Sequence, residues 1–204
     1  MIALQAEGLP LVEESISSAA FKKLNIVELG SGCGIVGISL AQTIPDCDVL
    51  LTDLPEAKEI AERNIAQMNS AMGSKARFIE LDWEQPLPLS VQTKTFDLIV
   101  VADCTYNPDS HEALVRTLQA LVGKAPKSVV LLSMKVRHET ELSFFELMAK
   151  ANFVEKPPVK LLLPEVGNDP ETVLVYVFHH RDRPAYADVS KAKLKKSVVQ
   201  FWED

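Results

Sequence analysis

The chain has 204 residues, a formal net charge of −7, 47% hydrophobic residues and 24% charged residues. This length suits one domain, and the composition is typical of a water-soluble globular protein, which excludes the disordered and fibrous classes. The acidic balance argues against a general nucleic-acid binder, because contacts with phosphates need an excess of Lys and Arg. No apolar run is long enough for a membrane span, and the N-terminus lacks the basic-then-apolar order of a signal peptide.

The cysteine usage points to a reducing compartment. Cys33, Cys47 and Cys104 are odd in number and far apart, and no Cys-x-x-Cys pair occurs. This pattern does not fit a disulfide framework, so we expect a cytoplasmic protein. The histidines are not spaced as metal ligands; His179 and His180 are adjacent, so on a strand they point to opposite faces. We therefore predict no metal site.

Apolar runs and helical patterns alternate along the chain. In chain order they predict a strand at 25–29, a helix at 35–43, a strand at 48–52, a helix at 55–68, strands at 77–81 and 96–102, a helix at 110–122, a strand at 128–134 and a helix at 140–151. Pro55 and the acids after it suit a helix N-terminus. The strand at 96–102 is apolar almost throughout, as a central parallel strand must be.

The end of the chain departs from this alternation. Strands are predicted at 159–163 and 172–178 with no helix between them, so one of the two runs antiparallel. The segment 188–203 has the pattern of an amphipathic helix. The prediction is a Rossmann-like α/β fold with a seven-strand sheet, mostly parallel with one late antiparallel strand, and helices on both faces. We expect a single domain over 1–204, with a short N-terminal segment at 1–24, a core at 25–180 and the C-terminal helix within 181–204.

A glycine-rich turn follows the first strand and opens the first helix. It runs from Glu28 through Gly30, Ser31, Gly32 and Gly34 to Gly37. Such a turn lets the backbone approach a ligand closely at the carboxyl end of a strand. Taken as Gly-x-Gly-x-x-Gly from Gly32, with Asp53 about 20 residues on, it matches a dinucleotide site. Taken from Glu28 as Glu-x-Gly-x-Gly-x-Gly, it resembles motif I of S-adenosylmethionine methyltransferases, so the glycines alone leave both cofactors open.

Three further features favour S-adenosylmethionine. Asp82-Trp83 follows the third strand, where a methyltransferase places groups against the adenine: a carboxylate accepts from its exocyclic amine, and an indole stacks on its face. The fourth strand ends in Ala102-Asp103-Cys104-Thr105-Tyr106. The Tyr-x-x-x-Lys pairing of many dehydrogenases is absent. An NAD-linked oxidoreductase therefore ranks last among the functions considered.

The motifs, taken in order, resemble the family 16 methyltransferase-like proteins, which are seven-strand methyltransferases. The matching residues are 28–38, Thr52-Asp53, Asn64-Ile65, Asp82-Trp83 and 103–106, and the resemblance covers roughly 25–178. Many members of this family methylate lysines on elongation factors, chaperones and other proteins. The resemblance therefore implies a protein-lysine N-methyltransferase whose partner is a lysine-bearing protein such as a translation factor or chaperone, and we expect a monomer.

The resemblance also implies residue roles. Glu28 places the amino-acid end of the cofactor and Asp53 holds both ribose hydroxyls. Asp103 and Tyr106 face the substrate and are the catalytic candidates. The remaining cofactor contacts are Gly30, Ser31, Gly32, Gly34, Asp82, Trp83 and Ala102.

Two other functions stay open on the sequence. One is a small-molecule N-methyltransferase of the same fold, acting on a nicotinamide-like amine. The other is a non-catalytic binding module, because family members generally carry a tryptophan before motif I that lies against the cofactor. Residues 1–24 hold no tryptophan, and Trp83 and Trp202 lie elsewhere. We expect another residue to close that side of the cofactor, or the affinity for it to be lower.

Overall fold

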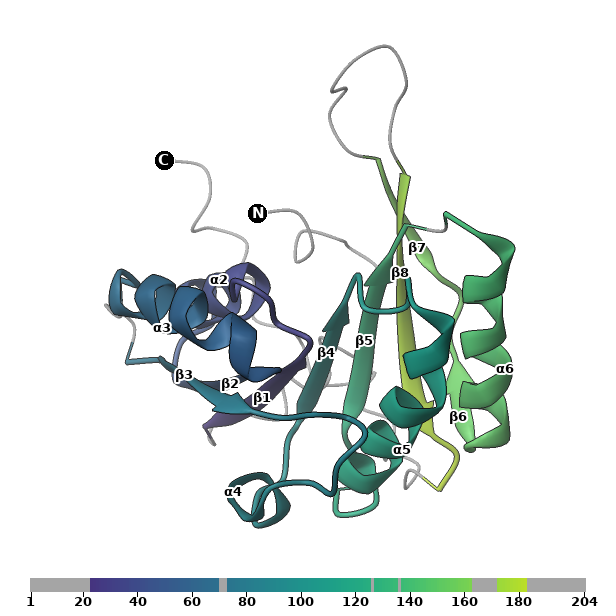
Figure 1. Cartoon of the computed structure of the whole chain (residues 1–204), viewed down its shortest axis with the longest axis horizontal. Coiled ribbons are helices and arrows are strands. Elements are labelled where there is room, and N and C mark those ends of the chain that lie inside the picture. Colours follow the sequence, from purple (N-terminus) through teal and green to yellow (C-terminus); the bar gives the residue numbers. More distant parts are fainter. Residues whose placement is uncertain (1–22, 70–72, 126, 136, 163–171, 183–204) are drawn as a thin grey trace, which may run out of the picture.

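A mixed β-sheet runs through the part of the chain that the computed structural model describes, residues 23–69, 73–125, 127–135, 137–162 and 172–182 (Figure 1). Its strands are β1 (Leu24–Leu29), β2 (Cys47–Asp53), β3 (Lys75–Glu80), β4 (Leu98–Ala102), β5 (Val129–Met134), β6 (Phe153–Glu155), β7 (Val159–Leu162) and β8 (Thr172–His180). They lie in the order β3-β2-β1-β4-β5-β8-β6, and β7 also pairs with β8. The pairs among β1 to β5 are parallel, whereas β8 runs antiparallel to β5, β6 and β7.

The last position of the sheet is shared by two short strands. β7 pairs with residues 172–175 of β8, and β6 pairs with residues 178–180. Pro157 and Pro158 stand between them, and proline interrupts a strand because it has no N–H to donate. The sheet thus has seven strand positions, and β8 is the single antiparallel strand. The predicted seven-strand sheet with one late antiparallel strand is confirmed.

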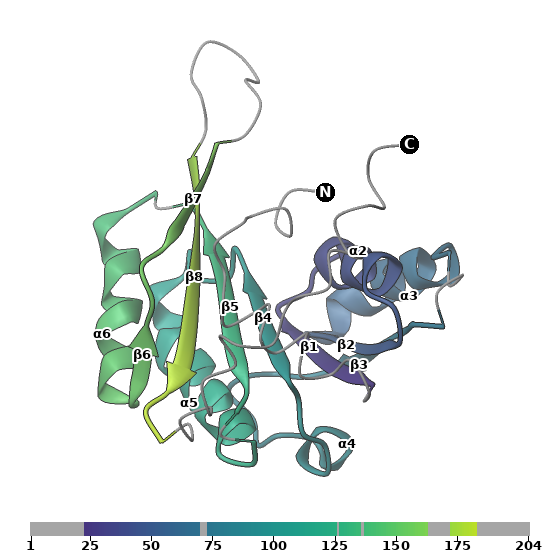
Figure 2. The ribbon, with the colours of Figure 1, turned by 180° about the vertical axis from the view of Figure 1, so that it is seen from behind.

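Helices cover both faces of this sheet. They are α2 (Ile35–Thr43), α3 (Lys58–Ala66), α4 (Leu89–Gln92), α5 (His111–Val122) and α6 (Ser143–Lys150), with short 3-10 turns at Pro55–Ala57, Pro108–Ser110 and Glu139–Leu142. Figure 1 and the view from behind in Figure 2 show α2 and α3 over the β1–β3 end, and α5 and α6 over the β5–β6 end. None of the helices in the described residues is long and apolar enough to span a membrane.

Two apolar cores follow from the alternation of side chains along each strand. On one face, Ile26 and Leu51 pack with Leu40 of α2. On the other face, Val27 and Ile99 join a cluster with side chains of α5 and α6. β4 and β5 are buried along almost their whole length, as the apolar runs predicted for central strands.

Most predicted elements are present with small shifts at their ends. The helix predicted at 35–43 is α2, and those predicted at 55–68 and 140–151 each begin with a 3-10 turn before α3 and α6. α4 and β6 were not predicted; each is a few residues long, too short for a periodic pattern. The predicted C-terminal helix at 188–203 and the segment 1–22 lie outside the described residues, so the single-domain division stays a prediction.

Candidate functional site

The predicted site residues meet at the carboxyl edge of the central parallel strands. β2, β1, β4 and β5 are neighbours, so the loops that follow them lie side by side. The glycine turn follows β1, Asp53 ends β2, and Asp103 follows β4. In open α/β sheets this edge, at the point where the strand order reverses, is where ligands bind.

The glycine turn has a backbone that suits glycine. Gly30, Gly32 and Gly34 have φ of +65°, +53° and +81°, in the left-handed region that other residues disfavour. The amide of Gly34 donates to the carbonyl of Ser31 at 2.8 Å. From α3, the side-chain amide of Asn64 donates to the carbonyl of Cys33 at 2.8 Å, which ties the turn to the neighbouring helix. Asn64 is part of the family motif, and its contact gives that motif residue a structural role.

Gly30 lies at a close approach of three segments. A Cβ on Gly30 would come within 2.6 Å of the Cys104 Sγ and 3.2 Å of the Trp83 ring. The Trp83 indole is half-buried and packs against the core beside this turn. Cys104 is buried, and burial raises the pKa of its thiol to about 12. Cys104 therefore acts as packing beneath the turn and not as a nucleophile.

Glu28 is 1% exposed and faces the N-terminal turn of α2. Its Oε2 accepts from the Gly37 amide at 2.8 Å. Burial raises the pKa of Glu28 to about 7, partly offset by this hydrogen bond, and the nearby Asp53 raises it further. A Cβ on Gly37 would come within 2.6 Å of the same carboxylate, so Gly37 allows α2 to pack closely on β1 and β2. Glu28 thus holds the helix behind the turn, and its predicted contact with the cofactor stays a prediction.

Asp53 and Ser31 fit a bound S-adenosylmethionine. Asp53 accepts from the amide of Gly32 at 2.7 Å and from that of Leu54 at 2.7 Å. A carboxylate has about four acceptor sites, so capacity is left for a pair of hydroxyls such as those of a ribose. The Ser31 Oγ is buried and has no hydrogen-bond partner among the described residues, which is typical of a group that a ligand completes. A Cβ on Gly32 would meet no atom within 4 Å, so open space lies beside the turn.

Asp82 starts the loop that carries Trp83. Its Oδ1 accepts from the amide of Glu84 at 2.9 Å, closing a tight turn. The Leu81 amide just before it donates to the Asp53 carbonyl at 2.8 Å, which places this loop beside β2. The structure thus brings the loop to the predicted cofactor site, and the adenine contact of Asp82 and Trp83 stays a prediction.

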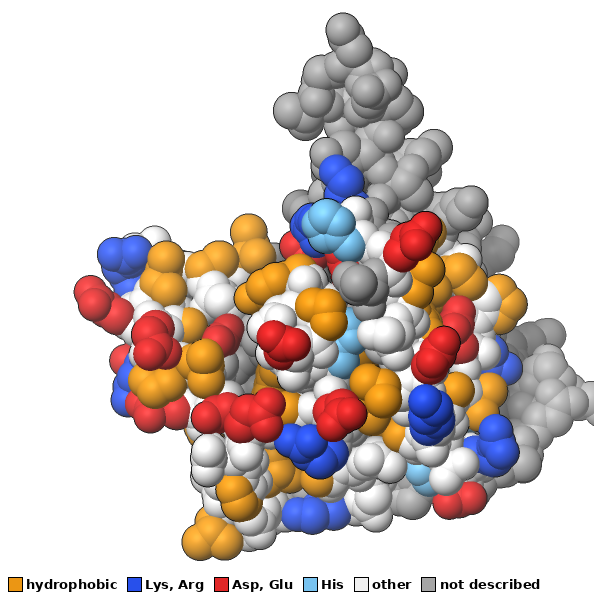
Figure 3. Space-filling model, turned by 45° about the vertical axis from the view of Figure 1, so that its right-hand side comes forward, with side chains coloured by type: hydrophobic (Ala, Val, Ile, Leu, Met, Phe, Trp, Pro, Cys, Tyr) orange, Lys and Arg blue, Asp and Glu red, His pale blue; other side chains and the backbone are white. Residues whose placement is uncertain are grey.

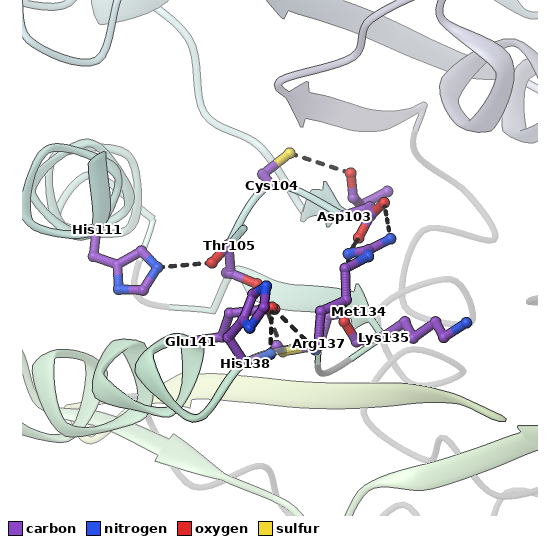
Figure 4. Close-up of polar contacts among 10 residues, drawn as sticks. Asp103, Cys104, Thr105, His111, Met134, Lys135, Arg137, His138 and Glu141 are labelled. Atoms are coloured by element: carbon purple, nitrogen blue, oxygen red, sulfur yellow. Dashed lines mark hydrogen bonds and ion pairs between the residues drawn. The ribbon is translucent and has the colours of Figure 1, made fainter. Parts of the chain in front are cut away.

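Asp103 turns sharply away from the end of β4, after the half-buried Ala102. Its φ is +54°, an uncommon value for a residue other than glycine, and its amide donates to the Ser133 carbonyl of β5 at 2.8 Å. Its carboxylate receives both ends of a guanidinium, at 2.6 Å from Arg137 Nη1 and 2.9 Å from Arg137 Nη2. Figure 4 shows this two-pronged pair between the loops after β4 and β5. The side chains of Asp103 and Arg137 remain 56% and 42% exposed.

Buried groups hold the loops on either side of this pair. The Glu141 Oε1 accepts from the amides of Arg137 and His138 at 3.0 and 3.1 Å, and Glu141 is 1% exposed. Across the site, the Nε2–H of the buried His111 donates to the Thr105 carbonyl at 2.9 Å (Figure 4). The segment that carries Asp103 and the loop that carries Arg137 are thus both anchored to the helical layer.

Tyr106 is 66% exposed, so its ring stands at the surface and not in the core. Its place three residues after Asp103 agrees with a group that faces a substrate, and its catalytic role stays a prediction. No cluster of three His, Cys, Asp or Glu side chains suited to a metal ion occurs in the described part of the chain.

The sequence analysis missed Arg137 and Glu141. Both follow β5 and lie more than 30 residues beyond Asp103. One signal was present: the basic residues of 135–138 follow an apolar strand run, and the ends of neighbouring parallel strands share one edge. The neighbour order of β4 and β5 would have placed these cations beside Asp103.

Comparison with known proteins agrees with this geometry. A sequence profile described as lysine methyltransferase matches residues 6–151. The chain belongs to the lysine methyltransferase family. The family predicted from the motifs is therefore confirmed.

Three curated relatives each match about 60% of this chain. A UPF0665 family protein of Schizosaccharomyces pombe is 38% identical over 123 residues, 60% of this chain and 37% of the relative. A calmodulin-lysine N-methyltransferase of Arabidopsis thaliana is 34% identical over 61% of this chain and 41% of its own length. The protein N-lysine methyltransferase METTL21A of Mus musculus is 35% identical over 64% of this chain and 58% of its own length. The chain therefore spans between 37% and 58% of the length of these relatives.

Solved structures match the fold of this family member. A SAM-dependent methyltransferase from Methanosarcina mazei has a TM-score of 0.59 and 17% identity, over 81% of this chain and 96% of that one. The magnesium protoporphyrin IX methyltransferase from Synechocystis PCC 6803 with bound SAM has a TM-score of 0.56 and 17% identity, over 82% and 76%. This member of the lysine methyltransferase family therefore has the Rossmann-like methyltransferase fold.

Proposed function

We propose that the chain is an S-adenosylmethionine-dependent protein-lysine N-methyltransferase. The observation that carries this proposal is the position of the exposed Asp103 carboxylate after β4, one strand from the glycine turn after β1 and two strands from the Asp53 carboxylate of β2. An acceptor for an amine thus stands beside a site that fits the cofactor. Membership of the lysine methyltransferase family supports the same activity.

The residues of the chain bind the cofactor and position the amine. Bound S-adenosylmethionine supplies an electrophilic methyl carbon. Asp53 and Ser31 hold the cofactor by the acceptor sites and the buried hydroxyl described above. The pKa of a lysine ammonium lies about three units above the pH of the cell, so removing its proton costs roughly 4 kcal/mol. Asp103 accepts a hydrogen bond from the amine and directs its lone pair toward the methyl carbon, so catalysis depends mainly on orientation.

A protein substrate is supported by the openness of this edge. Tyr106 and Asp103 are both more than half exposed, so a lysine on a large partner reaches them from solvent. Acidic and basic side chains are interspersed on the face over α5 and α6 (Figure 3). Among the described residues, this side therefore lacks the broad basic face that a nucleic-acid substrate would require.

The partner belongs to the same proposal. Among the relatives, one is named for calmodulin and others for EEF1A. We propose a lysine-bearing protein of this type, a translation factor or a chaperone, as the substrate. We also propose that the chain is a monomer and that it is cytoplasmic, and the free state of Cys33, Cys47 and Cys104 supports the cytoplasmic location.

The test combines the purified chain, tritiated-methyl S-adenosylmethionine and a size-fractionated cell lysate, with Asp103→Asn as the matched variant. We expect a labelled protein band whose hydrolysate contains methyl-lysine. Asp103→Asn keeps the shape of the side chain and removes its charge, so we expect turnover to fall by about 100-fold while cofactor affinity stays within about twofold.

Other outcomes overturn parts of the proposal. Label in the small-molecule fraction alone would identify a small-molecule N-methyltransferase. No transfer to any fraction would indicate a non-catalytic binding module. Turnover by Asp103→Asn at the wild-type rate would show that the charge of Asp103 has no catalytic role.

A further inference from the structure

The pair between Asp103 and Arg137 raises a question about charge. A carboxylate near an amine stabilises its protonated form, and the protonated amine has no lone pair for methyl transfer. Asp103 alone would therefore bind the lysine and also hold it in the unreactive state. In the structure, however, Arg137 lies on both carboxylate oxygens, at 2.6 and 2.9 Å.

We infer that Arg137 is a positioning residue that neutralises Asp103, so that the carboxylate orients a neutral lysine amine without favouring its protonated form. This inference rests on the proposed function. Each carboxylate oxygen has about two acceptor sites, so the guanidinium leaves a site for the amine N–H. A nearby guanidinium also lowers the pKa of an amine, as is known for lysines activated by a second cation.

The loop geometry supports a fixed guanidinium in place of a chance surface contact. The main chain of Arg137 is anchored by the buried Glu141, and the main chain of Asp103 by Ser133 of β5. The Arg137 Nη1 also lies 3.4 Å from the carbonyl of Lys135, in its own loop. A two-pronged guanidinium pair is geometrically specific, which lysine does not reproduce.

Other charged or titratable groups lie on the elements around Asp103. They are Lys135 and His138 in the loop of Arg137, Cys104 and Tyr106 after β4, Glu141 before α6, Glu28 on β1 and Asp53 on β2. In Figure 4 the side chain of Lys135 points away from Asp103. Arg137 is thus the cation that directly contacts the Asp103 carboxylate in this view.

The methyl transfer balances with the amine as nucleophile. The lysine ammonium first releases one proton to water. The amine lone pair then forms a bond to the methyl carbon of S-adenosylmethionine as the bond between that carbon and the sulfonium sulfur breaks. The electron pair of the broken bond stays on sulfur and leaves a neutral thioether. The product is a methylated ammonium, which loses its proton to water. Arg137 lowers the cost of the first proton release and takes no part in bond formation.

The test is the pH dependence of kcat for the lysate protein that the wild type labels most strongly, because kcat reports the ionisations of the enzyme–substrate complex. We expect Arg137→Gln and Arg137→Met to move the rising limb of this profile to higher pH by about one unit, because a lone Asp103 raises the pKa of the bound amine. At pH 7.5 this shift lowers kcat about tenfold, and the loss shrinks towards pH 10. Arg137→Lys loses the two-pronged geometry but keeps the positive charge that sets the pKa of the amine, so its limb should stay within about 0.3 unit of the wild type.

Lys23→Gln is the matched control, because Lys23 also pairs with a carboxylate, Asp48 at 2.9 Å, at the amino ends of β1 and β2 and so at the edge of the sheet opposite this site. Its profile, and the affinity of every variant for S-adenosylmethionine, should match the wild type. An unmoved limb in both neutral variants, or an equal loss at every pH, would overturn the inference and leave the function intact. A gain at pH 7.5 with an unmoved limb would mean that Arg137 competes with the substrate, which also overturns it. A wild-type chain that methylates no protein would overturn both.

Discussion

The β1–β3 end of the sheet holds its functional groups against a tightly shaped main chain, whereas the β4–β5 end presents exposed side-chain charges. At the first end, three glycines with positive φ shape the turn, and Asp53 and Asn64 fix it through hydrogen bonds to its backbone. At the second end, Asp103 and Arg137 meet as exposed side chains.

This difference follows from what each end is proposed to bind. A cofactor of constant shape favours a rigid cradle, in which backbone conformation carries recognition. A lysine delivered by a large partner needs an accessible edge with a few oriented charges. The following predictions test whether the two ends respond to substitution as this contrast requires, from the largest expected effect to the smallest.

The largest effect is expected at Gly30. In Gly30→Ala the new methyl meets the buried Cys104 Sγ at 2.6 Å, at a φ of +65°. The left-handed backbone costs about 1–2 kcal/mol and the overpacking about 1–3 kcal/mol more. Gly32→Ala is the matched variant, because its methyl meets no atom within 4 Å and only the backbone cost of about 1–2 kcal/mol applies. Urea unfolding should separate the two variants, and both should bind S-adenosylmethionine more weakly. Equal losses of stability in the two variants would show that the close packing of Gly30 against Cys104 does not limit the size of the residue at position 30.

Glu28 should make the stability of the β1–β3 end depend on pH. Its pKa is raised from 4.5 to about 7, so the folded state keeps a proton that the unfolded state releases. The contribution of Glu28 to the free energy of unfolding is fully present below pH 4.5 and is lost as the pH rises to about 7. The loss is up to roughly 3 kcal/mol, at about 1.4 kcal/mol per pKa unit.

Glu28→Gln cannot titrate, and its amide oxygen can still accept from Gly37. The difference in melting temperature, variant minus wild type, should therefore increase as the pH rises from 4.5 to 7 and stay constant above pH 7. A difference that is independent of pH would show that burial does not govern Glu28. Adding S-adenosylmethionine should shrink the difference if its cationic amino group lies near this carboxylate, as the sequence predicts.

Asp53→Ala should act on cofactor affinity more than on the fold. Asp53 accepts from the amide of Gly32 and is predicted to hold the ribose. Loss of two charge-assisted hydrogen bonds, at about 1.5 kcal/mol each, corresponds to about a 100-fold weaker Kd for S-adenosylmethionine. Isothermal calorimetry measures this, and Asp103→Asn serves as the comparison from the other end of the sheet. Unchanged affinity in Asp53→Ala would mean that the motif alignment is wrong.

The smallest effect concerns thiol reactivity in the folded chain. Cys47 and Cys104 are buried and burial raises the pKa of both thiols, whereas Cys33 in the glycine turn is partly exposed. Iodoacetamide at pH 8 should therefore label Cys33 first, and mass spectrometry of digests identifies the site. Labelling of Cys104 at a similar rate would mean that the packing beneath Gly30 opens readily.

The sequence alone determined the strand and helix order, the antiparallel end of the sheet and the positions of the cofactor candidates. These depend on local information: apolar periods, the spacing of glycines, and one carboxylate after each of the first strands. The short α4 and β6 escaped because a few residues carry no period.

Only the tertiary structure decided what the candidates contact. Glu28 was expected at the cofactor, and the fold shows it also bound to Gly37 of α2. Arg137 is 34 positions from Asp103 and has no motif of its own, yet the parallel pairing of β4 with β5 puts their loops together. The physical reason is that contacts across neighbouring strands depend on the strand order, which arises from long-range packing and leaves no local pattern in the chain.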